Sequence, residues 1–434
     1  MAREMNDSGI AWVGEIPSEW HTEKHKYLFS CGKEIVGTSS KSTQLLSLTT
    51  QGVKKKSSDA VGGKLPESFD TYQIVEENNL IMCLFDLDCS AVFSGLSPFC
   101  GMISPAYKVL KCSAKILPKF ADYWFKFVFD GRKFKSYAKN LRYTLNYDEF
   151  SCIPMALPNL EEQLRIAMFL DRKCAEIDSV IADTQRTIEE YKKLKQSVIT
   201  QAVTKGIRGE RPMKDSGIAW IGTIPAEWDV VRLKSLFGFG KGLPITKENL
   251  VETGIPVISY GQIHSKMTNG VELQQHLFRY VDEAYLDANP QSLVHQGDFI
   301  FADTSEDFDG CGNAVYINEE LTLFAGYHTI ILSSKDSTDN KYIAYQFQTD
   351  LWRSQIRSRV SGVKVFSISR KILGDATIIL PLADEREKIV AYLDEKCDAI
   401  DRIIAAKQQL IAEMESYKKS VIYEYVTGKK EVTV

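Results

Sequence analysis

The sequence predicts an α+β protein, in which two mixed, mostly β domains are joined by two long helices that pack as an antiparallel coiled coil, in a pseudo-twofold repeat. Three observations lead to this fold class. A block near the start of the chain returns after 208 residues, a second marker returns after 223 residues, and a seven-residue apolar pattern follows each copy of the second marker. Internal similarity at fixed offsets identifies a tandem duplication, so two copies of one architecture are expected.

The first domain is expected over residues 1–156 and the second over residues 207–379. Each copy opens with the motif Asp-Ser-Gly-Ile-Ala-Trp-x-Gly-x-Ile-Pro-x-Glu-Trp, at 7–20 and again at 215–228. Most positions of this block are identical, whereas the segments that follow share a pattern but little identity. Repeated ends around divergent middles would let two copies keep one scaffold while reading different targets.

The divergent middles combine short apolar runs with clusters of Gly, Pro, Asn and Ser. This pattern is typical of a β-rich domain with a few helices. A strand is expected at 79–82 in the first copy and at 298–301 in the second. The helices of the two middles are expected over 120–139 and 341–359.

The two spacer helices are expected over residues 157–206 and 380–434. Apolar residues recur there every seven positions in two interleaved series, which is the a/d pattern of a coiled coil. The stripes contain Leu170, Ile177, Ile181, Ile188 and Val198 in the first helix, and Leu393, Ile400, Ile404, Ile411 and Val421 in the second. A lysine interrupts both stripes at matched positions, Lys195 and Lys418.

A single helix of this length cannot bury its own apolar stripe, so each helix needs a partner. The nearest partner is the other copy, packed antiparallel because the chain folds back on itself. Packing of each helix on its own domain is the alternative.

The composition is that of a globular protein, with 44% hydrophobic and 25% charged residues among 434. No apolar run approaches the ~20 residues that a membrane span needs, and the polar start of the chain lacks a secretory signal pattern. The cytoplasm is therefore the expected location, with no membrane contact. Nine cysteines without a Cys-x-x-Cys pair argue against a disulfide framework and a zinc site.

Motifs for DNA chemistry are missing from the sequence. An adenine methyltransferase needs an Asn/Asp-Pro-Pro-Tyr/Phe segment to hold the flipped base, and no Pro-Pro pair occurs. A phosphate-binding Gly-x-x-x-x-Gly-Lys-Ser/Thr loop is also missing, which excludes ATP-driven translocation by this chain. No catalytic residue and no metal ligand is therefore assigned.

Basic and polar segments recur at matched places of the two middles, although the net charge is −4. A DNA-binding surface must then be a local basic face on a near-neutral domain. Amide, hydroxyl and cationic side chains are those that reach base edges and phosphates, although a charged loop is more often only solvated. The candidates are Lys54, Lys55, Lys56, Ser58, Arg142 and Tyr143 in the first copy, and Tyr260, Gln262, His264, Lys266, Arg357, Arg359 and Lys364 in the second.

The paired openings, and the two Leu-Pro segments that lead into long helices, resemble the specificity (S) subunits of type I restriction-modification enzymes. The resemblance covers essentially the whole chain. The first Leu-Pro segment continues through Glu162-Gln163, as in that family, whereas the second reads Glu385-Arg386. One marker of the family is therefore altered in the second copy.

This resemblance implies that each domain is a target recognition domain reading one half of a bipartite site in double-stranded DNA. It also implies that the helices set the unread gap and dock two methyltransferase subunits, and that restriction (translocase) subunits join the complex. S-adenosylmethionine, ATP and Mg²⁺ would then be bound by those partners, with no cofactor in this chain. The competing interpretations are a coiled-coil assembly scaffold without DNA specificity and a DNA-modifying enzyme, the latter disfavoured by the missing motifs.

Overall fold

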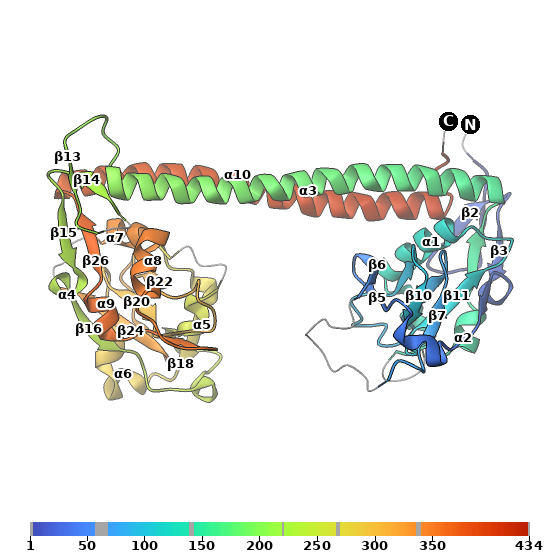
Figure 1. Cartoon of the computed structure of the whole chain (residues 1–434), viewed down its shortest axis with the longest axis horizontal. Helices are drawn as coiled ribbons and strands as arrows, with labels where there is room; N and C mark the ends of the chain where they lie inside the picture. Colours follow the sequence, from blue (N-terminus) through green and yellow to red (C-terminus); the bar gives the residue numbers. More distant parts are fainter. Residues whose placement is uncertain are drawn as a thin grey trace. The chain divides into compact units, whose positions relative to one another are not determined.

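The computed structural model describes residues 3–56, 68–138, 143–218, 221–265, 270–335 and 340–432. The chain divides into two compact units: unit 1 comprises Met1–Gln185 and Gln408–Val434, and unit 2 comprises Arg186–Lys407. The boundary crosses both long helices, so each unit combines a β-rich body with the helix ends that pack on it (Figure 1). The expected domain boundaries, which separate bodies from helices, stay a prediction.

Unit 1 is built on a sheet with the strand order β4-β11-β8-β9, all neighbours being antiparallel. Strand pairs β1-β2, β3-β12, β5-β6 and β7-β10 accompany it in the described part of the unit. The strands are β1 Met5–Asp7, β2 Glu15–Pro17, β3 His21–Lys24, β4 Phe29–Cys31, β5 Leu46–Thr49, β6 Gly52–Lys55, β7 Gln73–Val75, β8 Leu80–Met82, β9 Ser94–Leu96, β10 Gly101–Ile103, β11 Lys108–Cys112 and β12 Pro154–Leu157. The helices of this body are α1 Pro118–Asp130 and α2 Tyr147–Ser151.

Unit 2 repeats this plan in its sheet β16-β24-β20-β22 and adds a second sheet, β18-β17-β23-β19, in which β17 and β23 are parallel. The pairs β13-β14 and β15-β26 match β1-β2 and β3-β12, and β21 pairs with β25. The strands are β13 Met213–Asp215, β14 Thr223–Pro225, β15 Asp229–Arg232, β16 Phe237–Lys241, β17 Ile255–Ile258, β18 Arg279–Val281, β19 Leu293–Val294, β20 Phe299–Ala302, β21 Thr304–Ser305, β22 Ala314–Tyr316, β23 Leu323–Ala325, β24 Thr329–Ser334, β25 Phe366–Ser367 and β26 Thr377–Leu380. The helices of this body are α4 Leu233–Leu236, α5 Tyr260–Ile263, α6 Tyr285–Ala288, α7 Lys341–Phe347, α8 Asp350–Arg357 and α9 Arg370–Gly374.

Both expected body helices were too long. The first ends at Asp130 and is followed by a short 3-10 segment at Lys133–Tyr137. The second is divided into α7 and α8 because Thr349 caps a new helix, its hydroxyl accepting a hydrogen bond from the Trp352 amide. The expected strands at 79–82 and 298–301 correspond to β8 and β20.

The two spacer helices are α3, Leu160–Lys205, and α10, Ala383–Val426. In unit 1 the start of α3 packs on the end of α10, where the rings of Phe169 and Tyr425 lie 4.3 Å apart. In unit 2 the end of α3 packs on the start of α10, where Lys195 pairs with Asp401. Helix pairing is therefore antiparallel within each unit, and the expected α+β fold class is confirmed.

The apolar stripes are buried or half-buried, and their ends join the cores of the bodies. Leu170, Ile177 and Ile188 of α3 and Leu393, Ile400 and Val421 of α10 are buried, whereas Ile181, Val198, Ile404 and Ile411 are half-buried. The main core of unit 1 joins Leu170 and Val421 to aromatic residues of α1, and that of unit 2 joins Ile199 and Leu393 to aromatic residues of α7 and α8. The helix ends thus belong to the same cores as the bodies that they carry.

Candidate nucleic-acid interface

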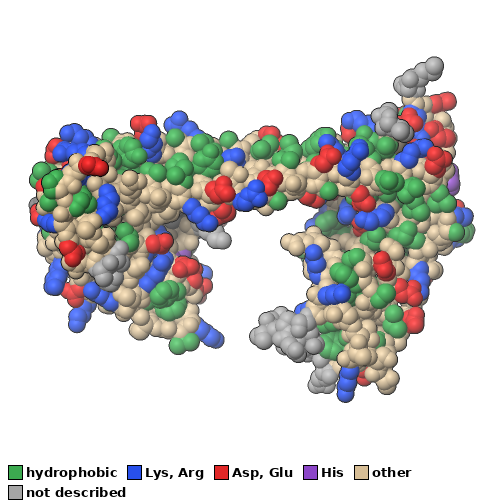
Figure 2. Space-filling view, turned by 45° about the horizontal axis from the view of Figure 1, so that its top comes forward, with side chains coloured by type: hydrophobic (Ala, Val, Ile, Leu, Met, Phe, Trp, Pro, Cys, Tyr) green, Lys and Arg blue, Asp and Glu red, His purple; other side chains and the backbone are tan. Residues whose placement is uncertain are grey.

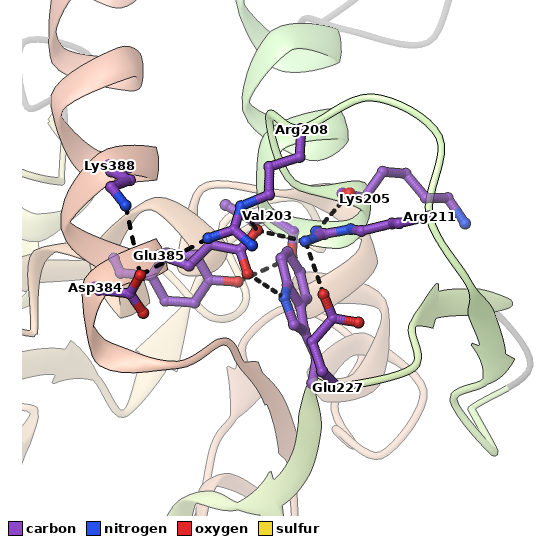
Figure 3. Close-up of polar contacts among 10 residues, drawn as sticks. Val203, Lys205, Arg208, Arg211, Glu227, Asp384, Glu385 and Lys388 are labelled. Carbon is purple, nitrogen blue, oxygen red and sulfur yellow. Dashed lines mark hydrogen bonds and ion pairs between the residues drawn. The ribbon is translucent and has the colours of Figure 1, made fainter.

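A buried carboxylate ties the repeat opening of unit 2 to the first turn of α10 (Figure 3). Glu385 is 1% exposed, and its Oε2 accepts a hydrogen bond from Nε1 of Trp228 at 2.9 Å. Its Oε1 lies 2.6 Å from Nη1 of Arg211, which is also 3.1 Å from a carboxylate oxygen of Glu227. Arg211 further donates to the carbonyl oxygen of Lys205 at the end of α3. We call these contacts the unit 2 clamp.

The unit 1 clamp repeats these contacts with the residues at matched positions. Glu162 of α3 is buried, accepts a hydrogen bond from Nε1 of Trp20 at 2.9 Å, and lies 2.7 Å from Nη2 of Arg3. Arg3 also donates to Glu19 at 2.6 Å, and this hydrogen bond lowers the pKa of Glu19. Burial acts to lower the pKa of Arg3, but the hydrogen bonds to both carboxylates outweigh it, so that pKa is raised.

The clamps explain why Trp and Glu recur in the openings: they hold each body on a helix end. Sequence reasoning missed Arg3 and Arg211, which precede the recognised block but share its offset of 208 residues. It also treated Glu385-Arg386 as a departure from Glu162-Gln163. The first residue of each pair has the same role, and only the second differs: Gln163 bonds the backbone of Leu117 and Lys115.

The interrupting lysines of the apolar stripes face carboxylates of the opposite helix. Within unit 2, Nζ of Lys195 lies 2.6 Å from Asp401, and within unit 1, Nζ of Lys418 lies 2.7 Å from Asp178. Both the lysines and the aspartates are separated by 223 residues, so the two ion pairs are copies of each other. Each lysine is therefore part of the helix pairing.

In unit 2, sequence-predicted residues from distant segments meet around the loop 303–310. His264 Nε2 lies 2.8 Å from the carbonyl oxygen of Thr304, and its Nδ1 lies 3.2 Å from Nδ2 of Asn313. Arg357 donates from Nη2 to the carbonyl oxygen of Asp309 at 2.7 Å. The same loop pairs with the segment after Lys364, because Thr304 faces Ser367 across β21 and β25.

An aromatic cluster that the sequence did not indicate extends this surface. The ring of Tyr260 lies 5.7 Å from that of Tyr327 and 5.5 Å from that of His328. His328 has a φ of 55°, a left-handed conformation that is rare outside glycine, and its Nδ1 is 3.3 Å from Asp303. Strained backbone of this kind is concentrated at functional sites. Tyr260 belongs to α5, whereas Tyr327 and His328 lie in the turn between β23 and β24, so no sequence spacing could have grouped the three rings.

The segment with Gln262 was expected to be a loop, but it forms the single-turn helix α5. Ser259 and Gln262 form a capping box, in which Gln262 Oε1 accepts a hydrogen bond from the Ser259 amide at 3.0 Å. The amide oxygen of Gln262 is thus used inside the protein, which leaves its amide nitrogen for a ligand. The S-x-x-Q spacing is a known start signal for helices, so this error was avoidable.

The remaining cations of unit 2 differ in how they are held. The side chain of Arg357 is 16% exposed and pairs with Asp309 and Asp350, so it serves as an internal contact. Arg359 and Lys364 are exposed. Arg359 lines a cleft together with Arg232 and Lys371. The two exposed residues are the better placed for phosphate contacts.

In unit 1, the basic run at 54–56 is not wholly a loop, because Lys54 and Lys55 belong to strand β6 of a hairpin with β5. Nζ of Lys55 lies 4.7 Å from the centre of the Phe99 ring, and Lys54 and Lys56 are exposed. Lys55 and Lys56 line a cleft with polar residues of the segment 40–44. This arrangement presents cations beside amide and hydroxyl groups.

Tyr143 lies in a different set of contacts of unit 1. Its carbonyl oxygen accepts from the Leu87 amide, Nζ of Lys135 lies 4.3 Å from its ring centre, and its φ is 45°. Ser58, Arg142 and Lys266 lie outside the described residues. On the face drawn in Figure 2, Lys and Arg side chains are interspersed with Asp and Glu over both bodies.

Over the ranges that the structure describes, no group of three or more His, Cys, Asp or Glu side chains is placed to hold a metal ion. Over those ranges, too, no helix combines the length and the apolar character needed to cross a bilayer.

The chain is similar to proteins of known function over most of its length. The family model described as "Type I restriction modification DNA specificity domain" matches residues 225–416. Two relatives come from Methanocaldococcus jannaschii. The type I restriction enzyme MjaVIII specificity subunit is 23% identical over 86% of this chain and 84% of its own length. The putative type I restriction enzyme MjaX specificity subunit is 27% identical over 73% of this chain and 69% of its own length.

A solved structure shares the fold. It comes from work entitled "Structural basis underlying complex assembly and conformational transition of the type I R-M system", and it covers 96% of this chain and 99% of its own. The TM-score is 0.69 at 15% identity. The chain is therefore similar over most of its length to the specificity subunits of type I restriction-modification enzymes, and residues 225–416 match the DNA specificity domain of that family.

Proposed function

We propose that this chain reads a bipartite site in double-stranded DNA, one half-site per unit, and that the paired helices set the unread gap. The observation that carries the proposal is the contrast between repeated anchoring contacts and divergent polar surfaces. The clamp and the helix ion pair each occur once in unit 1 and once in unit 2. A duplication that keeps its anchors and varies its exposed loops suits a protein that reads two different short sequences.

The chain would contribute position and sequence reading, and its partners would contribute chemistry. Two methyltransferase subunits that bind S-adenosylmethionine would dock on the helices and the repeat openings, one for each copy. Restriction subunits would supply ATP- and Mg²⁺-dependent cleavage. Because the sequence carries no methyltransferase or nucleotide-binding motif, this chain would be non-catalytic.

Each polar surface has the groups that direct readout requires. The unit 2 surface combines the Gln262 amide nitrogen, the His328 imidazole and the cations Arg359 and Lys364, whereas both ring nitrogens of His264 are held by Thr304 and Asn313. Amide and imidazole groups read base edges, whereas lysine and arginine also neutralise phosphates. The unit 1 surface presents a lysine-rich hairpin instead, so the two half-sites should differ in sequence.

Mapping methylated adenines in a genome that carries this chain with its partner subunits tests the proposal. The expected result is a split site with two constant halves and a fixed gap. A Gln262→Ala variant should change the sequence preference of one half only, whereas a Lys54→Gln variant should weaken binding to all sequences and leave the preference of both halves unchanged. Methylation without a split site, or a Gln262→Ala change that alters both halves, would contradict the proposal.

A further inference from the structure

Unit 2 carries a group of exposed apolar side chains, Phe308, Val363 and Val365, next to the polar surface. Val363 is 96% exposed, the largest exposure of any big apolar side chain among the described residues. Val365 and Phe308 are each 48% exposed, and the ring of Phe308 lies 5.5 Å from that of Phe366. Single exposed apolar residues are common, whereas a group of them on two adjoining loops is typical of an interaction site.

The loop that carries Val363 is closed at its base. Ser361 forms a bridge with Ser367, whose amide donates to the Ser361 carbonyl oxygen at 3.2 Å. Gly362 has a φ of 149°, and a Cβ there would lie 2.0 Å from the carbonyl oxygen of Val365. Only glycine fits this turn, so the backbone itself presents Val363 outward.

Charge at this loop points to a polyanionic occupant. The exposed cations Arg359 and Lys364 flank Val363, and the cleft beside Arg359 is lined by the further cations Arg232 and Lys371. Acidic residues near this loop are partly neutralised by ion pairs with neighbouring cations. Arg357 pairs with Asp309, and Lys234 lies 2.8 Å from Asp375, the carboxylate of that cleft.

Duplex DNA offers both an anionic backbone and one apolar feature in its major groove, the C5-methyl group of thymine. Side chains that unstack base pairs as wedges are mostly longer or bulkier than valine, such as Phe, Leu, Ile and Met. A short branched side chain between two cations therefore suits contact with a methyl group at the groove edge.

We propose that Val363 is a specificity-determining residue that contacts the C5-methyl group of a thymine in the half-site read by unit 2. Arg359 and Lys364 hold the loop on the flanking phosphates. The inference rests on the proposed function, because it requires that unit 2 reads DNA.

Binding measurements on uracil-substituted duplexes test this contact. The intact complex is titrated with duplexes carrying its mapped site, in which each thymine of the unit 2 half-site is replaced in turn by 2′-deoxyuridine. One replacement should weaken binding about fourfold, the value of one buried methyl group. Val363→Ala should weaken binding to the natural duplex by a similar factor and abolish the sensitivity to uracil at that position alone.

Lys364→Gln is the matched control, since it keeps the loop but removes a cation. It should weaken binding to all duplexes, reduce the salt dependence by about one unit, and retain the uracil sensitivity. Three outcomes would overturn the inference: uracil sensitivity that persists in Val363→Ala, no sensitivity at any thymine, or a unit 2 half-site made only of G·C pairs.

A role of this loop in protein docking has its own signature. Val363→Ala would then lower the number of partner subunits bound in sedimentation measurements and leave the relative affinities for thymine and uracil duplexes unchanged, which also overturns the inference. If the proposed function itself were wrong, the result would be different. The unaltered complex would then bind duplexes of unrelated sequence equally well.

Discussion

The same contacts hold the body on the helices in both units, but the exposed segments of the two bodies differ. In both, a buried glutamate of a long helix binds a tryptophan and an arginine of the repeat opening, at distances that differ by no more than 0.1 Å. In both, a tyrosine of the body bonds an aspartate of the helix: Tyr123 with Asp171, and Tyr345 with Asp394. The exposed segments diverge, with a hairpin of β5 and β6 in unit 1 and the helix α5 beside a second sheet in unit 2.

The difference separates two kinds of constraint on the sequence. A buried carboxylate needs its partners, because an unpaired buried charge is costly, and so the anchoring residues match in both copies. Exposed loops carry little stability, and their residues are set by what they contact. Residues that are the same in both copies are explained by contacts within the structure. Residues that differ between the copies should be explained by the ligand that each unit contacts.

The largest effect is expected when one clamp is broken. Glu385→Ala would remove the buried carboxylate from Arg211 and leave it paired with the more exposed Glu227, and should destabilise unit 2 by about 3–5 kcal/mol. Glu162→Ala should do the same to unit 1. Urea unfolding with pulsed hydrogen exchange assigns each loss to a unit. Glu395→Ala on exposed α10 surface is the control and should change stability by less than about 0.5 kcal/mol.

An acid-sensitive core should distinguish unit 1 from unit 2. His25 is fully buried among phenylalanine rings, and burial lowers its pKa from 6.5 to about 3. The unfolded chain therefore binds a proton more readily than the folded one, so stability is present above pH 6.5 and is lost as the pH falls toward 3. Between pH 7 and pH 5 the loss should be about 2 kcal/mol.

The second copy supplies the control for this prediction, because Leu233 occupies the position that matches His25. His25→Leu should remove the additional pH dependence of unit 1 in urea unfolding at pH 7 and pH 5. Equal acid sensitivity of wild type and His25→Leu would show that other groups dominate.

Basic residues of the unit 1 hairpin should have a smaller effect, on binding alone. Lys54→Gln and Lys56→Gln should each weaken binding to every duplex and lower the salt dependence by about one unit per lost phosphate contact. The folded chain should keep its stability within about 0.5 kcal/mol. Affinities at several salt concentrations measure both quantities, and a changed sequence preference would instead assign these lysines to base edges.

The smallest effects are expected for the helix ion pairs. Both pairs are partly exposed, and exposed pairs contribute about 0.2–1 kcal/mol. A double-mutant cycle on Lys195→Ala and Asp401→Ala should give a coupling in this range, and the cycle on Lys418 and Asp178 should match it. Couplings that differ strongly between the copies would show that the two helix ends are not equivalent.

Periodic features were predictable because they depend on residues close in sequence. The repeat offsets and the apolar stripes of α3 and α10 follow directly from spacing. The break between α7 and α8 combines a local signal, the cap residue Thr349, with a tertiary contact in which Gln346 exchanges two hydrogen bonds with the backbone of Ile379. The contact with that distant strand could not be predicted from local spacing.

Interface residues were predictable only in part, for the same physical reason. The types and positions of Tyr260, His264 and Lys364 drew attention to two segments. Their meeting around Thr304, and the addition of His328 beside Asp303, result from sheet pairing over long separations. Local sequence carries no signal for such pairings.

The division of the chain also has a consequence for the order in which it folds during synthesis. Unit 2 is one continuous stretch, Arg186–Lys407, whereas unit 1 needs Gln408–Val434 in addition to its first segment. Val421 and Val426 fill the core of unit 1, and Lys429 bonds the carbonyl oxygen of Glu15. Domains usually complete in the order of translation, but here the body made first must wait, with part of its apolar surface uncovered, until after the second is finished. During that interval the ribosome-bound chain is most exposed to aggregation and to chaperones.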